Sequence, residues 1–179
     1  MSIKHPMLAI RIENRRSLLI SLLVMVVIIF IIFRFLDVPL RTQAAPSGIV
    51  SYELAGTTTQ ANLILQSWGS SARLYAAFGL GFDYLFMLIY AATLSLACLM
   101  SGSRLTGWLS RLGSWLAWGM ILAAGADAVE NLSLWSELNG QVTPLWSGLA
   151  AACATLKFTL LLLGVLYSLA GWLLPGRKS

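Results

Sequence analysis

Histidine is almost missing from this chain of 179 residues, and its scarcity removes several kinds of chemistry. The single histidine, His5, lies in the N-terminal tail, away from the long apolar runs. A histidine-based metal site, or a Ser/His catalytic pair inside a membrane, would therefore have no histidine to use. We expect neither a metal site nor a catalytic residue of this kind.

Cysteine is scarce as well, because the chain holds only Cys98 and Cys153 and no CxxC motif. The two fall in different expected spans and differ in depth by about 20 Å, whereas a disulfide needs Cα atoms within about 7 Å. Thiol oxidation chemistry is therefore unsupported. We expect both thiols to be buried in apolar surroundings.

Charged residues make up only 11% of the chain, against 58% hydrophobic residues and a mean hydropathy of +0.80. These values lie far outside those of soluble domains and indicate an integral membrane protein. The net charge of +5 does not indicate nucleic-acid binding, because lysine and arginine are scattered at the ends of the apolar runs. The lipid bilayer is the expected partner.

Four apolar segments are long enough to cross a membrane, at residues 17–36, 74–100, 112–134 and 147–174. They predict an all-α integral membrane protein whose residues 1–179 form one domain, a four-helix bundle. The first segment is too long and too uniformly aliphatic for a signal-peptide core, so we expect it to be an uncleaved anchor. Gly79 and Gly81 precede Asp83 in the second span and would loosen the helix there.

Both termini are expected in the cytoplasm of a multi-pass cell-membrane protein. Eight of the twelve lysines and arginines fall in the tails and in the connection after the second span. Three others (Arg34, Arg41 and Arg73) lie at or beyond the opposite interface, and Lys157 lies within a span. An excess of positive charge marks the cytoplasmic side.

The expected outer loop, residues 37–73, contains one short helical segment. Residues 61–68 combine apolar side chains with Trp68, and the threonines at 57–59 offer a helix cap. We expect a short interfacial helix that covers the bundle. The alternative is a lid over an outward-facing cavity.

Acidic and amide side chains interrupt the third span at Asp127, Glu130 and Asn131. On a helix these positions are i, i+3 and i+4, so the three side chains share one face and must meet protein or water rather than lipid. Rise per residue places Asp83 and Lys157 about 12–15 Å below the outer interface and Asp127 about 22 Å above the inner end of its helix. All three therefore lie in the middle or outer half of the membrane. Glu130 and Asn131 lie one turn further out, level with Arg34. The sequence therefore predicts one polar layer shared by four helices.

Charges in this layer are expected to pair, since a central charge costs about 2.5–3.5 kcal/mol on the insertion scale. Lys157 would face Asp127 or Asp83, Arg34 would face Glu130, and remaining carboxyl groups would stay protonated. Tyr90 shares a helix face with Asp83 and completes the candidate site, although packing also explains a tyrosine there.

A resemblance covers residues 48–131. The residues that carry it are Gly48-Ile49-Val50, Glu53-Leu54-Ala55-Gly56-Thr57, Trp68-Gly69, Asp83 and Asp127-Ala128-Val129-Glu130-Asn131. This pattern resembles small bacterial four-span proteins of the inner membrane, a family that brings no activity with it.

The Glu130-Asn131 pair is also similar to a pair in the microsomal glutathione-transferase superfamily, whose members bind lipophilic substrates and glutathione. In that superfamily the pair lies in the second helix, flanked by arginine and a further asparagine. Here it lies in the third span with neither.

Three classes of function follow from the polar layer. It binds or transports a small amphipathic molecule, a cation or a proton; or it fixes the packing of a structural or accessory subunit of another membrane protein; or it supplies acid and base to an intramembrane enzyme. The enzyme has the least support, because no nucleophile or metal set accompanies the carboxylates. Nothing in the sequence names a cofactor.

Overall fold

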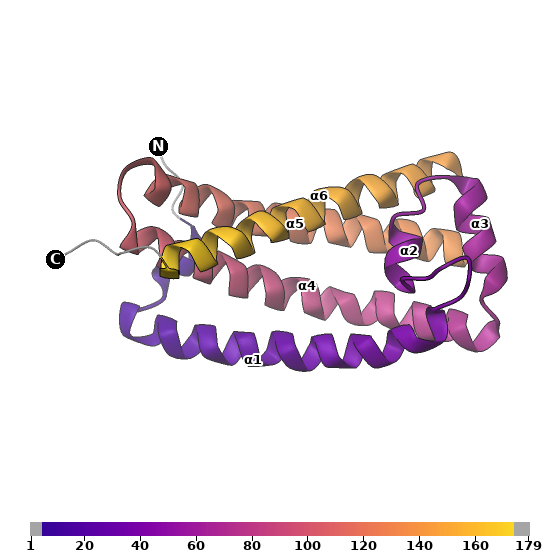
Figure 1. The fold of residues 1–179 in the computed structure, drawn as a ribbon, viewed down its shortest axis with the longest axis horizontal. Coiled ribbons are helices and arrows are strands. Elements are labelled where there is room, and N and C mark those ends of the chain that lie inside the picture. Colours follow the sequence, from indigo (N-terminus) through magenta and orange to yellow (C-terminus); the bar gives the residue numbers. More distant parts are fainter. Residues whose placement is uncertain (1–4, 174–179) are drawn as a thin grey trace.

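Four long helices dominate the computed structural model, which describes residues 5–173 (Figure 1). They are α1 (Ile12–Asp37), α4 (Ser70–Arg104), α5 (Gly107–Leu138) and α6 (Pro144–Leu173). Each is long and apolar enough to cross a membrane, and the described residues contain no strand. The fold is therefore all-α, as the sequence predicted.

Each predicted span lies inside one of these helices. The predicted end of the fourth span, residue 174, falls outside the described residues, as do Lys4, Arg177 and Lys178. The expectation that Gly79 and Gly81 loosen the second span is wrong, because α4 is helical without interruption through both glycines. Its 35 residues extend about 52 Å, more than the roughly 30 Å hydrocarbon core requires.

Helix α4 is the centre of the bundle and packs against all three other long helices. Helix α6 packs against α5 and α4, whereas α1 packs mainly against α4. Few α1 side chains are buried, and large apolar ones such as Val27, Ile31 and Phe35 are exposed along its length. These side chains face the bilayer in a membrane-spanning bundle. Among residues 5–173, α1 and α6 make no extensive contact with each other.

Residues 38–69 form a folded cap over one end of the bundle (Figure 1). The cap contains the 3₁₀ turn η2 (Val38–Leu40) and the helices α2 (Ile49–Glu53) and α3 (Thr58–Ser67). Thr57 caps α3 by accepting a hydrogen bond from the backbone N–H of Gln60 at 3.2 Å. Both ends of the described chain lie at the opposite end of the bundle, as an even number of crossings requires.

Two aromatic side chains hold the cap together, and one of them, Tyr52, also fastens it to α5. Tyr52 donates to the carbonyl of Leu134 at 3.1 Å, and Trp68 Nε1 donates to the carbonyl of Leu40 at 2.8 Å. Their rings pack edge to face with centroids 5.1 Å apart, a contact worth about 0.5–1.5 kcal/mol beyond the area that it buries. The cap therefore holds α2 in a fixed position.

Asp37, the last residue of α1, sets the start of α2. Its Oδ1 accepts from the backbone N–H of Ile49 at 2.8 Å, and its Oδ2 accepts from Arg41 Nε at 2.9 Å. Gly48 precedes Ile49 with a φ of 59°, and any Cβ there would overlap the Asp37 carboxylate. Only glycine fits this turn.

The N-terminal segment folds against the opposite end of the bundle through the 3₁₀ turn η1 (Pro6–Ala9). His5 is buried, its Nδ1 accepts from the N–H of Met7 at 3.2 Å, and its ring packs edge to face on Trp118 with centroids 5.0 Å apart. Burial lowers the pKa of His5 from its ordinary value of 6.5. Both cysteines are free thiols; Cys98 is buried as expected, whereas Cys153 is only partly buried, contrary to expectation.

Candidate functional site

Lys157 is the centre of a buried ionic cluster. Its Nζ donates to Asp127 Oδ1 at 2.9 Å and to Glu130 Oε1 at 3.0 Å, and Glu130 Oε2 lies 2.9 Å away. Only 4% of Lys157, 1% of Asp127 and none of Glu130 is exposed. The structure thus places the α6 lysine against two α5 acids, one of which, Asp127, the sequence had named as a partner.

A fourth member of the cluster comes from the cap. Glu53, the last residue of α2, places its Oε1 3.9 Å from Lys157 Nζ. Burial raises the pKa of the Glu53 carboxyl, and the charge of Lys157 acts in the opposite direction. We call Glu53, Asp127, Glu130 and Lys157 the Lys157 cluster.

Two further polar pairs extend this cluster toward α4. Tyr90 donates its hydroxyl proton to Asp127 Oδ2 at 2.8 Å, so both oxygens of Asp127 are occupied. Asn131 Nδ2 donates to Asp83 Oδ2 at 2.9 Å. Asp83 is half-buried and has no cation within 4 Å among residues 5–173. It is therefore the acid of this layer that no protein charge balances.

Carboxyl groups outnumber cations at this depth. Glu53, Asp83, Asp127 and Glu130 share one ammonium group, that of Lys157. Full ionisation would leave carboxylates without a balancing cation within 4 Å in a medium of low dielectric, which favours the binding of a further cation.

Arg34 does not pair with Glu130, contrary to expectation. Glu130 is occupied by Lys157, and Arg34 is an exposed residue of α1 with no acid within 4 Å among the described residues. The reason is the packing of α1, which lies against α4 and not against α5. Arg34 instead lines the wall of a cavity.

This cavity of about 220 Å³ lies between α1, α4, α6 and the cap. Its apolar wall combines aliphatic residues with four aromatic side chains from three helices, namely Phe30, Phe33, Phe86 and Phe158. Its polar wall includes six buried or half-buried side chains in addition to Arg34, namely Asp83, Asp127, Asn131, Tyr90, Lys157 and Glu53. One space therefore touches both aromatic and charged groups.

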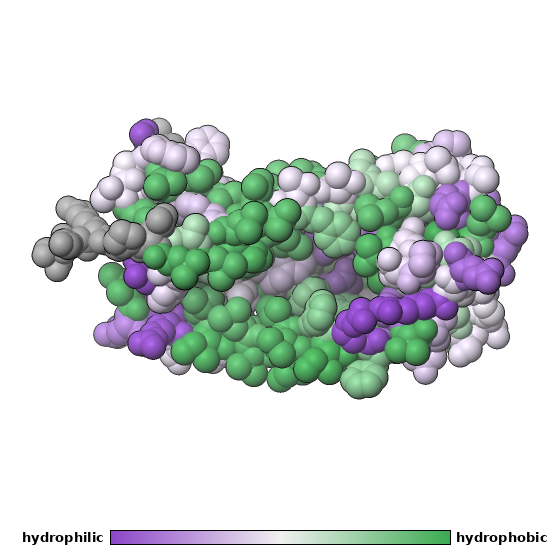
Figure 2. All heavy atoms as spheres, in the orientation of Figure 1, coloured by the Kyte–Doolittle hydropathy of each residue, from purple (hydrophilic) through white to green (hydrophobic). Residues whose placement is uncertain are grey.

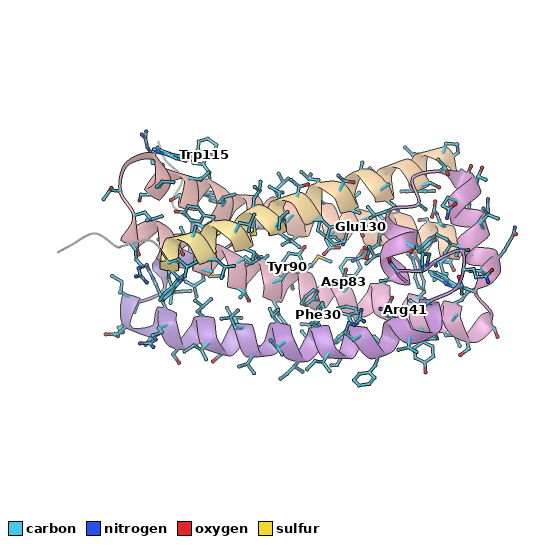
Figure 3. All side chains as sticks on the ribbon, in the orientation of Figure 1. Phe30, Arg41, Asp83, Tyr90, Trp115 and Glu130 are labelled. Atoms are coloured by element: carbon cyan, nitrogen blue, oxygen red, sulfur yellow. The ribbon has the colours of Figure 1, made fainter. Side chains whose placement is uncertain are left out.

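The cavity opens on the side of the bundle. Figure 2 shows a hollow between the apolar surfaces of α1 and α6, with hydrophilic residues at its floor. Figure 3 shows Asp83 and Tyr90 in this gap between α1 and α6, and Phe30 on the α1 side of it. A hollow on the side of a membrane-spanning bundle faces lipid rather than water.

The polar wall carries unused hydrogen-bond acceptors. Asn131 Oδ1 and Glu53 Oε2 are buried and have no partner in the structure. Both residues line the cavity, Asn131 with 1% and Glu53 with 8% of its surface exposed. An unpaired buried acceptor costs about 1–3 kcal/mol, so such atoms indicate a missing partner.

Sequence analysis missed Glu53 as a site residue and also missed a second buried acid, Glu137. Ser147 donates to Glu137 Oε1, which joins α5 to α6 beside the cap and outside the cavity. The signal for Glu53 was its place directly after a largely apolar run, Ile49-Val50-Ser51-Tyr52. Such a run predicts a buried segment, and an acid at the end of a buried segment is then expected to be buried too.

Comparison with protein-family models, with curated proteins and with solved structures found no match for this chain. The geometry of the site therefore carries the functional argument alone.

Proposed function

We propose that this chain is a multi-pass membrane protein that binds a small amphipathic molecule in the cavity beside the Lys157 cluster. The observation that carries the proposal is the cavity itself, which brings an aromatic wall and unpartnered buried acceptors into one space of about 220 Å³. Apolar pockets with a few convergent polar groups are the usual form of small-molecule sites. Binding can be the first step of transport, because unpaired Asp83 lies within a span.

We further propose that both termini face the cytoplasm and that the cap lies at the outer membrane interface, with α3 along its surface. The arginines near the cap, Arg34, Arg41 and Arg73, are fewer than those assigned to the opposite side. The resemblance to bacterial four-span proteins implies the inner membrane.

The second candidate is a structural role, in which the polar layer only fixes helix packing. The contacts of Lys157 with Asp127 and Glu130 favour it, because they join α6 to α5 in the middle of the bundle. This role accounts for the ion pairs. It gives no reason for a cavity beside them or for the acid Asp83, which no cation balances.

Two glycines of α4 provide a matched test of these alternatives. A Cβ placed on either Gly79 or Gly81 meets no atom within 4 Å, but Gly79 lines the cavity and Gly81 does not. Gly79→Leu should place a side chain in the cavity, whereas Gly81→Leu adds the same side chain outside it. Both changes replace a helical glycine and so have the same intrinsic effect on the helix.

The measurement is mass spectrometry of small molecules extracted from protein purified in mild detergent. We expect the wild type and Gly81→Leu to retain a stoichiometric amphipathic molecule and Gly79→Leu to lose it. If the three samples carry the same lipids in the same amounts, the cavity binds nothing and the structural role is correct.

A further inference from the structure

The hydrogen-bonding character of the cavity defines the chemistry of its ligand. Asn131 Oδ1 and Glu53 Oε2 are unpartnered acceptors, and Asp83 is a carboxylate whose side-chain partner is the neutral amide of Asn131. The buried donors at this depth are already used, since Lys157 bonds to Asp127 and Glu130 and Tyr90 bonds to Asp127. The remaining cation of the lining, Arg34, is an exposed residue of α1. The polar wall therefore offers acceptors and negative charge, and needs a ligand that supplies donors and positive charge.

A primary ammonium group meets both needs. It carries one positive charge and three N–H donors, as a lysine side chain does. A quaternary ammonium group carries the same charge without any N–H and would leave the buried acceptors unpaired. Sites built around buried hydrogen bonds reject analogues that lack the donor far more strongly than apolar pockets reject a change in size.

The shape of the cavity indicates where the rest of the ligand lies. Its volume of about 220 Å³ is below the roughly 300–1,000 Å³ of sites that enclose a whole drug-sized molecule. Phe30 of α1 and Phe158 of α6 both line it, and both are exposed at the bundle surface. A polar group fits inside, and an attached apolar chain would leave between α1 and α6 into lipid.

We propose that the ligand is an amphiphile with a primary ammonium group, which enters from the bilayer between α1 and α6 and places its nitrogen against Asp83, Glu53 and Asn131. This inference rests on the proposed function and adds the ligand class and the route. Arg34 lines the same cavity and is free to contact a phosphate group next to the ammonium, as in a zwitterionic aminophospholipid.

The test uses the full chain in nanodiscs of phosphatidylglycerol, a lipid without an amine. Phosphatidylethanolamine, which has a primary ammonium group, and phosphatidylcholine, which has a quaternary one, are added with identical acyl chains, and bound lipid is counted by native mass spectrometry. We expect the wild type to prefer the primary amine by about tenfold or more, the effect of one charge-assisted hydrogen bond.

Asp83→Asn should remove this preference, because it keeps the size of the side chain and removes the charge. Glu137→Gln is the control, since Glu137 is a buried acid that does not line the cavity. The inference is wrong if the wild type binds both lipids equally or if Asp83→Asn keeps the preference. If Asp83→Asn does not fold, the comparison of the two lipids on the wild type decides alone. A third outcome is that Gly79→Leu displaces bound lipid but the wild type shows no preference between the two headgroups. That outcome would overturn the ligand class and leave the proposed function intact.

Two competing primary amines distinguish entry of the ligand from the bilayer from entry from water. Dodecylamine partitions into the bilayer, whereas butylamine carries the same ammonium group and stays in water. We expect dodecylamine to displace phosphatidylethanolamine at far lower concentration. Equal potency would contradict entry from the bilayer, and failure of both amines to compete would show that the phosphate, not the ammonium, is recognised.

Discussion

Replacement of Lys157 tests the charge arrangement at the centre of the bundle. Lys157→Met keeps an unbranched apolar stem and removes the one cation that the described part of the chain places within 4 Å of Asp127 and Glu130. Removal of one member of a buried ion pair costs about 3–5 kcal/mol. Neutralisation or rearrangement of the stranded carboxylates recovers part of this cost, so the lower part of the range applies. We expect a loss of stability of about 2–4 kcal/mol.

Double variants identify the partner of the lysine. Asp127→Asn or Glu130→Gln, added to Lys157→Met, removes a stranded charge and should each recover about 1–3 kcal/mol. Asp83→Asn should not, because Asp83 bonds to Asn131 and lies outside the 4 Å contacts of Lys157. The assay is reversible unfolding in mixed detergent micelles, followed by circular dichroism.

Three results would refute this reasoning. The first is a Lys157→Met variant as stable as the wild type. The second is a set of double variants whose losses of stability are the sums of the single ones. The third is a recovery of stability by Asp83→Asn, and by neither of the other two changes, when it is added to Lys157→Met. Each would place the lysine charge somewhere other than between the two α5 acids.

Two further predictions concern the ends of the bundle. A cysteine placed in the loop at residues 139–143, in a variant without the native thiols, should react with an impermeant reagent added to intact cells. Tags at both termini should stay protected from that reagent. A labelled terminus would show that the proposed topology is wrong. His5 titrates with a lowered pKa in the folded state, so docking of the N-terminal segment should be unaffected above pH 6.5 and weaken as the pH falls below that value, where the undocked histidine gains a proton. Hydrogen exchange at residues 6–10 measures this, and His5→Phe should remove the pH dependence; an unchanged profile in that variant would mean that another group is responsible.

Helical periodicity and rise per residue predicted much of the polar layer. Asp127, Glu130 and Asn131 had to share a face because of their spacing, and the depth of Lys157 placed it level with Asp127. These quantities are local to one helix, so they need no knowledge of its neighbours.

Periodicity and rise per residue could not predict contacts that depend on the rotation of a helix about its axis or on packing between distant segments. Depth placed Arg34 level with Glu130, but α1 packs against α4 and leaves Arg34 at the cavity wall. Glu53 reaches Lys157 because the Asp37–Ile49 hydrogen bond and the glycine turn at Gly48 fold the cap back over the bundle. Neither the turn nor the cavity has a periodic signature, so the sequence pattern did not contain them.

The most direct test of the central claim is an experimental structure of the wild-type chain in native lipid. The account predicts elongated density that is not protein, with one end against Asp83 and the other passing between Phe30 and Phe158 toward the bilayer. A structure in which α1 closes onto α6 and protein side chains fill the 220 Å³ cavity would contradict it.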